Sequence, residues 1–127
     1  MNRLLALLIL TFPMTLIPAA AAEAPYSSNT FKQLLAIGEA FAVVFHADWC
    51  PTCRAQAPLL KELADSPALK RLTLLIANFD TELEARKAMN VTKQSTIIVF
   101  RNGQEIARST GDTDRLSLAT LLRAAVS

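Results

Sequence analysis

The stretch FAVVFHADWCPTC, residues 41–53, decides how this chain can fold. Its first part, 41–45, is a continuous apolar run with two valines at its centre, which favours a strand buried on both faces. A proline then opens a segment with leucines at helical spacing, and this predicts a helix over 51–65. Cys50 and Cys53 are therefore expected where a buried strand passes into a helix.

Strands and helices alternate on both sides of this stretch. The expected elements, in chain order, are a helix over 30–37, the strand over 41–45, the helix over 51–65, a strand over 72–79, a helix over 81–89, strands over 96–100 and 105–108, and a last helix from about residue 113. Two capping boxes, Thr30 with Gln33 and Thr81 with Glu84, are expected to open two of the helices.

Short local signals mark where these elements end or bend. Gly38 should end the first helix, and Pro58 should kink the second because proline removes a helical hydrogen bond. The pair Asn102-Gly103 predicts a tight turn that makes the last two strands an antiparallel hairpin. Four leucines of the last helix are expected to reach the core: Leu116, Leu118, Leu121 and Leu122. We therefore predict an α/β fold with a mixed central sheet of about four strands, parallel in its first half, and helices on both faces.

The first 22 residues have the pattern of a targeting segment. Arg3 supplies a positive start, an apolar stretch broken by Pro13 follows, and the small residues Ala19 to Ala22 are typical of a cleavage site. We predict a signal peptide over 1–22, cleaved near Ala22, which would place the protein in the periplasm or otherwise outside the cytoplasm. The alternative is an uncleaved anchor, although the apolar run is shorter than the ~20 residues of a spanning helix.

The rest of the chain is expected to be a short polar lead-in over 23–29 and one domain over 30–127. About 105 residues are enough for a single hydrophobic core. Charge is nearly balanced in the whole sequence, with 13 Lys and Arg against 11 Asp and Glu. Because no basic run indicates nucleic acid or an anionic membrane surface, we expect protein or small-thiol partners, no nucleic acid, no membrane contact after cleavage, and a monomer.

The two cysteines of the chain are better explained by reactivity than by stability. A bridge between positions this close would enclose too short a loop to staple a fold. In an oxidising compartment an inert disulfide is one alternative reading. Half of a zinc site is another, but zinc needs about four ligands, and only His46 and carboxylates are available to join the thiols.

A cysteine at the start of a helix is chemically activated. The unpaired amides and the helix dipole should stabilise a thiolate at Cys50, lower its pKa and make it the attacking sulfur. Cys53, one turn further in, can then attack the mixed disulfide, release the substrate and leave a Cys50–Cys53 disulfide. Pro51 keeps the turn rigid at a place where its missing N–H is not needed. Trp49 and Thr52 are expected to line the same site.

These residues resemble the thioredoxin family over about 30–125. The resemblance is carried by ADWCPTC at 47–53, Pro58, Asp80, the Asn102-Gly103 turn and Gly111. It implies a thioredoxin fold and a thiol–disulfide oxidoreductase without a cofactor, in which Cys50 is the nucleophile and Cys53 the resolving thiol. The chain is too short for the helical insertion of DsbA-type oxidases, and we expect the family's usual first strand to be absent.

Two departures from the family concern buried charge. Val44 stands where thioredoxins usually place a buried aspartate that accepts a proton from the second cysteine, and Ile76 stands where they often carry a lysine. The loss of both charges need not harm the fold, but it should change the redox tuning of Cys53. His46 alternates onto the same strand face as Val44, and histidine changes charge near neutral pH, so it is a candidate base. A packing role for His46 is the alternative.

The third departure is the segment Gln94-Ser95-Thr96, where the family has a cis-proline and a substrate-binding loop. A cis bond before serine would cost about 2.5–4 kcal/mol, so we predict a trans bond. Ser95 and Gln94 could hydrogen-bond a thiolate or a substrate backbone. Loss of the proline ring is expected to leave the sulfurs less shielded. The alternative is a neutral substitution in a tolerant loop.

The sequence therefore predicts an exported enzyme that exchanges disulfides with protein or small-thiol substrates. Its electron donor or acceptor could lie in the membrane, and its short chain favours the reductant direction. Two other classes stay open. One is a soft-metal module in which Cys50 and Cys53, with His46, hold Cu(I) or zinc. The other is a redox-inert interaction domain.

Overall fold

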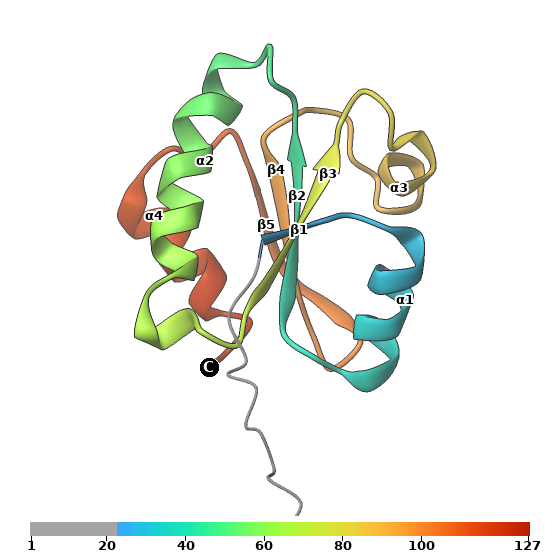
Figure 1. Ribbon diagram of the computed structural model, residues 1–127, viewed down its shortest axis with the longest axis vertical. Coiled ribbons are helices and arrows are strands. Elements are labelled where there is room, and N and C mark those ends of the chain that lie inside the picture. Colours follow the sequence, from blue (N-terminus) through green and yellow to red (C-terminus); the bar gives the residue numbers. More distant parts are fainter. Residues whose placement is uncertain (1–22) are drawn as a thin grey trace, which may run out of the picture.

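The buried strand at 41–46 is the centre of a five-stranded sheet in this computed structural model, which describes residues 23–127 (Figure 1). Its strands are β1 (Glu23–Pro25), β2 (Phe41–His46), β3 (Thr73–Asn78), β4 (Thr96–Arg101) and β5 (Gln104–Thr110). Across the sheet they lie in the order β1-β3-β2-β4-β5. The β1, β3 and β2 strands are parallel to one another, and β4 is antiparallel to both β2 and β5. The parallel pair β2-β3 and the antiparallel hairpin β4-β5 agree with the prediction. The predicted signal peptide over 1–22 lies outside the described residues.

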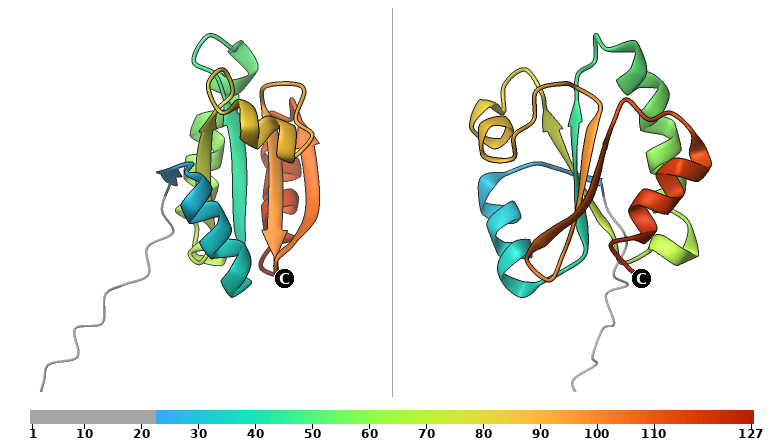
Figure 2. Two further views of the ribbon diagram at one scale, coloured as in Figure 1. Left: turned by 90° about the vertical axis from the view of Figure 1, so that its right-hand side faces the viewer. Right: turned by 180° about the vertical axis from the view of Figure 1, so that it is seen from behind.

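Helices cover both faces of this sheet. They are α1 (Ser28–Ile37), α2 (Pro51–Ala64), α3 (Leu83–Ala88) and α4 (Arg115–Arg123), with a short 3₁₀ turn at Pro67–Leu69. In Figures 1 and 2, α1 and α3 lie on one side of the sheet, and α2 and α4 lie on the other. The predicted fold class, a mixed sheet between two helical layers, is confirmed.

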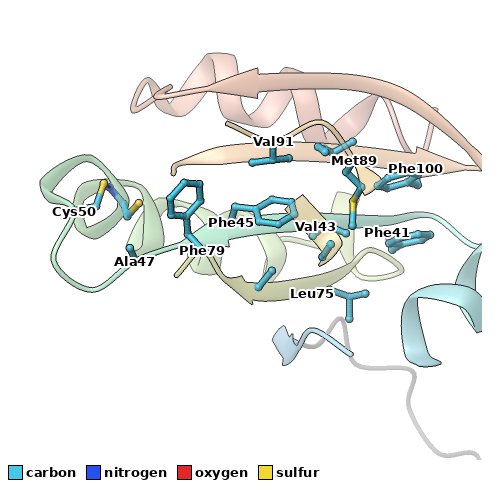
Figure 3. Close-up of a cluster of buried hydrophobic side chains, with 14 residues drawn as sticks. Phe41, Val43, Phe45, Ala47, Cys50, Leu75, Phe79, Met89, Val91 and Phe100 are labelled. Atoms are coloured by element: carbon cyan, nitrogen blue, oxygen red, sulfur yellow. Dashed lines mark hydrogen bonds between the residues drawn. The ribbon is translucent and has the colours of Figure 1, made fainter. Parts of the chain in front are cut away.

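Burial on both faces explains why β2 reads as a continuous apolar run. Phe41, Val43 and Phe45 alternate toward one core, which they share with α1 and α3, and each is 0% exposed. Ala42 and Val44 point into the second core, under α2 and α4. Figure 3 shows the first core extending from Phe41 past Phe45 to Cys50. The reactive segment is therefore anchored to packed apolar side chains.

The expected absence of a first strand is wrong, because part of the predicted lead-in belongs to the sheet. β1 pairs in parallel with β3, with Glu23 opposite Leu74 and Pro25 opposite Ile76. Proline is tolerated here because β1 is an edge strand and one of its sides needs no N–H. β1 has only three residues, one of them a proline, and so shows no periodic pattern in the sequence. It forms a strand because β3 lies beside it.

Both predicted capping boxes are also wrong. α1 begins two residues before Thr30, and Ser27 caps it by accepting a hydrogen bond from the Thr30 N–H at 3.0 Å. At α3 the cap position, Glu82, makes no side-chain cap bond. The Asn78 carbonyl instead accepts the N–H groups of Thr81 and Glu82.

The last helix meets the core through fewer leucines than predicted. Leu118 and Leu122 are 0% exposed and Leu121 is partly buried, but Leu116 is 72% exposed. α4 starts at Arg115, after the Asp114 side chain accepts the Ser117 N–H at 2.8 Å. Leu116 thus lies in the first turn, on the outward side of the helix, and its place in the core was wrongly predicted.

The hairpin at Asn102-Gly103 is confirmed and yields a test of backbone constraint. Gly103 has φ +74°, and a Cβ there would lie 3.2 Å from the Leu35 carbonyl oxygen. Gly111 has φ +75°, and a Cβ there would meet no atom of the described residues within 4 Å. Gly111→Ala should lower the free energy of unfolding by about 1–2 kcal/mol, the cost of a left-handed alanine. Gly103→Ala should cost more, because it adds the contact with Leu35.

Urea unfolding of the two variants measures this difference, provided that the slope of the transition is unchanged. Equal losses for Gly103→Ala and Gly111→Ala would show that the contact with α1 does not constrain the turn.

Candidate active site

Sheet topology brings two separated segments together at the carboxyl end of β2. The chain leaves β2 at His46 and enters α2 at Pro51. Because β4 is antiparallel to β2, its first residue, Thr96, lies opposite Phe45. The Ser95 N–H donates to the Phe45 carbonyl at 2.9 Å. Ser95 therefore lies beside cysteines that are more than 40 positions away in sequence.

Cys50 is the cap residue of α2, as the sequence predicts. Its Sγ accepts the Cys53 N–H at 3.2 Å, and its own N–H donates to the Ala47 carbonyl at 3.1 Å. A sulfur thus occupies the place where a capping oxygen usually binds an unpaired helix amide. Both cysteines are free thiols, and they are only 2% and 1% exposed.

Two opposing effects set the acidity of Cys50. Burial raises the pKa of its thiol, but hydrogen bonds from the Cys53 thiol, the Ser95 hydroxyl, the Cys53 amide and the Gln94 side chain outweigh burial and lower it to about 7. A thiol with this pKa is about half ionised at neutral pH. Cys50 is therefore the sulfur suited to attack.

Cys53 has the opposite character. Burial raises the pKa of its thiol, and the hydrogen bond that it gives to Cys50 raises it further, while bonds from Ser95 and Ala47 offset only part of this. The thiol of Cys53 thus stays protonated at neutral pH and donates to its neighbour. The two sulfurs thus differ in acidity: burial raises the pKa of both thiols, but Cys50 accepts the hydrogen bond that Cys53 donates and has further donors in the Cys53 amide and Gln94.

Ser95 is the residue that links the two sulfurs. Its Oγ lies 3.0 Å from Cys53 Sγ and 3.4 Å from Cys50 Sγ, so the predicted hydrogen bonding to a thiolate is supported by the geometry. The described residues contain no cis peptide bond, which agrees with the predicted trans bond before Ser95. Its φ of 63° lies in the left-handed region. The expectation of poorly shielded sulfurs is wrong, because Cys50 and Cys53 are only 2% and 1% exposed, and Ser95 beside them is 1% exposed.

The other predicted site residues are close to the cysteines but play different parts. Trp49 is 57% exposed, and its Nε1–H donates to Asp80 Oδ2 at 2.8 Å. Pro51 is the first residue of α2 and is exposed, and Thr52 is half-buried. The Thr96 hydroxyl donates to the Lys93 carbonyl at 2.8 Å, so it braces the loop.

His46 lies on the same side of β2 as Val44, as its position in the strand predicts. Together with Cys53 they line a cavity of about 210 Å³, whose other walls include Glu23, Leu60 and Ile76. His46 Nε2 also lies 2.9 Å from Asp48 Oδ1. The structure thus brings His46 to the same cavity as the second cysteine, although no hydrogen bond joins them directly in the described residues.

Gln56 is a site residue that the sequence analysis missed. It is 1% exposed, and its Nε2 donates to the Asp112 carbonyl at 2.8 Å and to the Ser95 carbonyl at 3.5 Å. The Ser95 carbonyl also accepts the Gly111 N–H at 3.1 Å. Gln56 therefore holds the Ser95 loop against α2. Its position one turn after Cys53, on the buried side of the helix, was the available signal.

The described residues contain neither a metal-ligand cluster nor a membrane-spanning helix. Residues 23–127 contain no group of three or more His, Cys, Asp or Glu side chains that could hold a metal ion. No helix among them is long and apolar enough to cross a membrane. The soft-metal reading stays a hypothesis that rests on the two thiols alone.

The fold and the site define a class of protein: an α/β domain with a dithiol at the start of a helix. The thioredoxin family model matches residues 23–124. A thioredoxin from Chlamydia pneumoniae is 33% identical over 96 residues, which cover 76% of this chain and 91% of that protein. The chain therefore belongs to the thioredoxin family and is a thiol–disulfide oxidoreductase.

Solved structures agree with this assignment. The crystal structure of Trxlp from Edwardsiella tarda EIB202 has a TM-score of 0.77 and 40% identity, and the match covers 80% of this chain and 98% of that one. A thioredoxin from Malassezia sympodialis has a TM-score of 0.74 at 22% identity, over 83% and 93% of the two chains, and it shows the fold alone.

The acidity of Cys50 predicts the pH dependence of its alkylation. Only the thiolate reacts, so the rate with iodoacetamide should rise with pH, reach half its maximum near the pKa of about 7, and level off above it. One pH unit below the midpoint the rate should be about a tenth of the plateau. A midpoint at about 8.5, the value of a free cysteine, would contradict the hydrogen-bonded site.

Removal of the Ser95 hydroxyl should raise that midpoint. Because the hydroxyl bond lowers the pKa of Cys50, Ser95→Ala is expected to shift the alkylation profile to higher pH and to slow the reaction at pH 6. Alanine keeps the Cβ, so it removes only the Oγ. Ser109→Ala is the matched control, because the Ser109 Oγ is buried without a hydrogen-bond partner among the described residues. Identical profiles for the two variants would show that Ser95 does not act on the sulfur.

Proposed function

We propose that this enzyme works outside the cytoplasm as a monomeric disulfide reductant of protein and small-thiol substrates. Cys50 is the nucleophile and Cys53 the resolving thiol. The observation that carries this proposal is the Cys50 Sγ at the start of α2, which accepts the Cys53 N–H at 3.2 Å and has a pKa of about 7.

The exchange has two balanced steps. The Cys50 thiolate attacks one sulfur of a substrate disulfide, a Cys50–substrate disulfide forms, and the other substrate sulfur leaves as a thiolate. Cys53 then loses its proton and attacks Cys50 Sγ, which releases the second substrate sulfur as a thiolate. The substrate gains two electrons, and the enzyme is left with a Cys50–Cys53 disulfide.

The acidity of Cys50 supports the reductant direction. A pKa of about 7 is that of thioredoxin-like reductants, whereas strong oxidants of the DsbA kind stabilise a far more acidic thiolate, near about 3.5. A more stable thiolate makes the reduced form more stable and the enzyme more oxidising. Among residues 23–127, the groups that stabilise the Cys50 thiolate by hydrogen bonds are neutral ones, from Cys53, Ser95 and Gln94.

Export is supported by the targeting pattern in the first 22 residues. An exported reductant must be reduced again after each turnover, and its compartment is kept oxidising. A membrane-bound electron donor that reduces the Cys50–Cys53 disulfide would meet this requirement.

Insulin reduction with dithiothreitol tests the proposed activity. The wild-type protein should accelerate insulin precipitation, and Cys50→Ser should abolish the acceleration because no sulfur remains to form the mixed disulfide. Pre-reduced Cys53→Ser, mixed with insulin without dithiothreitol, should instead accumulate the mixed disulfide, since no second thiol of the enzyme can release it. Activity in Cys50→Ser equal to that of the wild type would refute the assignment.

The reduction potential of the Cys50/Cys53 pair tests the direction. We expect a value nearer to about −270 mV, typical of thioredoxin, than to about −120 mV, typical of DsbA. Equilibration with glutathione or dithiothreitol buffers gives this value. A potential near −120 mV would make the enzyme an oxidant and overturn the direction, although not the exchange chemistry.

A further inference from the structure

The second step of the exchange requires a proton acceptor for Cys53. Burial and its hydrogen bond to Cys50 hold this thiol in the protonated form. Val44 and Ile76, which lie beside it, are apolar. The proton must therefore leave through some other group that reaches the thiol.

The cavity beside Cys53 offers such a route. It lies against α2, which contributes Gln56 and Leu60, and against the strands that contribute Val44 and Ile76. Two side chains that can accept a proton also line it, His46 and Glu23. Its volume of about 210 Å³ is large enough for several water molecules. Because the wall carries the polar groups of Gln56, His46 and Cys53, water in it has hydrogen-bond partners.

The contact between His46 and Asp48 decides which ring nitrogen can act as a base. His46 Nε2 lies 2.9 Å from Asp48 Oδ1. An ionised carboxylate can only accept, so in the neutral ring Nε2 must carry the hydrogen. Nδ1 is then the nitrogen with a free lone pair. Once protonated, the ring keeps its bond to Asp48 as an ion pair. A base held in one tautomer by a carboxylate is a recurring arrangement in nucleophilic catalysis.

We propose that His46 accepts the proton of Cys53 through water in this cavity, with Asp48 fixing the tautomer. The proposal rests on the proposed exchange function and assigns the base of its second step. The Cys53 S–H bond breaks, its proton passes through water to His46 Nδ1, and the sulfur attacks Cys50 Sγ. The bond between Cys50 and the substrate sulfur breaks, and that sulfur leaves as a thiolate. His46 then releases the proton to solvent.

The charged groups that face His46 come from three parts of the chain. Glu23 from β1 lines the same cavity, Asp48 binds Nε2, and Asp80, after β3, lines a neighbouring hollow together with His46. All three are acidic side chains, and no Lys or Arg among residues 23–127 lines either hollow. Glu23 is also the competing acceptor, so the test must separate it from His46.

Reaction with Ellman's reagent separates the two steps in one experiment. Attack by Cys50 releases a first equivalent of thionitrobenzoate, at a rate that depends on reagent concentration. Attack by Cys53 on the mixed disulfide releases a second equivalent, at a rate that is independent of reagent concentration. Near pH 7, His46→Gln should slow the second phase about tenfold or more, since a well-placed general base typically contributes ~10²–10⁴-fold. The difference should shrink as the pH rises, because Cys53 then ionises without help.

Three further variants make the assignment specific. Glu84→Gln, an exposed carboxylate on α3, should change neither phase. Glu23→Gln should slow the second phase less than His46→Gln. Asp48→Asn should also slow the second phase, because an amide does not hold the His46 ring in one tautomer. An unchanged first phase in each variant shows that the fold and Cys50 are intact.

The outcomes are distinct. Equal second phases for the wild type and His46→Gln at every pH would overturn the proposal, and a larger effect of Glu23→Gln would assign the base to Glu23 instead. No effect of Asp48→Asn would overturn the role of its carboxylate. Failure of the wild type to reduce insulin would defeat the proposed function itself, whereas these outcomes would defeat only the role of His46.

Discussion

The hydrogen bond from the Ser95 N–H to the Phe45 carbonyl, 2.9 Å long, is the contact on which the site depends. It is the point where β4 meets the end of β2, and it fixes the register that places Ser95 Oγ against both sulfurs. Phe45 is held in turn by a core that is closed to water on that face of the sheet. The acidity of the cysteines is thus set by packing several residues away, because hydrogen bonds to buried sulfurs need fixed partners.

The site also shows how a buried dithiol can work without a buried charge beside it. Cys50 is stabilised by neutral donors, namely the Cys53 thiol and amide, the Ser95 hydroxyl and the Gln94 side chain. Val44 and Ile76 form apolar walls of the cavity next to Cys53. An apolar wall avoids the cost of desolvating a charge pair. In the mechanism that we propose, the proton of Cys53 is instead handled by His46, at the carboxyl end of the central strand β2. Ser95 and His46 would then serve Cys53 from two sides, one by hydrogen bonding and the other by proton transfer.

The sequence predicted those parts whose signals are local. The apolar run over 41–45, the helix after Pro51 and the Asn102-Gly103 turn each act through neighbouring residues, and all three are present. β1 could not be predicted, because its three residues form a strand only when β3 lies beside them. The cap at Ser27 was missed because Thr30, a residue of the same type, offers an equally good pattern three positions later. Gln56 was missed because its partners, Ser95 and Asp112, are distant in sequence.

The left-handed backbone of Ser95 limits which side chains this position can hold. Proline requires φ near −65°, whereas residue 95 has φ 63°. Replacement of Ser95 by proline would therefore force the peptide units on both sides to rotate. Proline also has no N–H, so the hydrogen bond to the Phe45 carbonyl would be lost, and the hydroxyl beside the two sulfurs would be lost with the serine. The backbone at this position thus excludes the imino acid and keeps a donor of hydrogen bonds next to the dithiol.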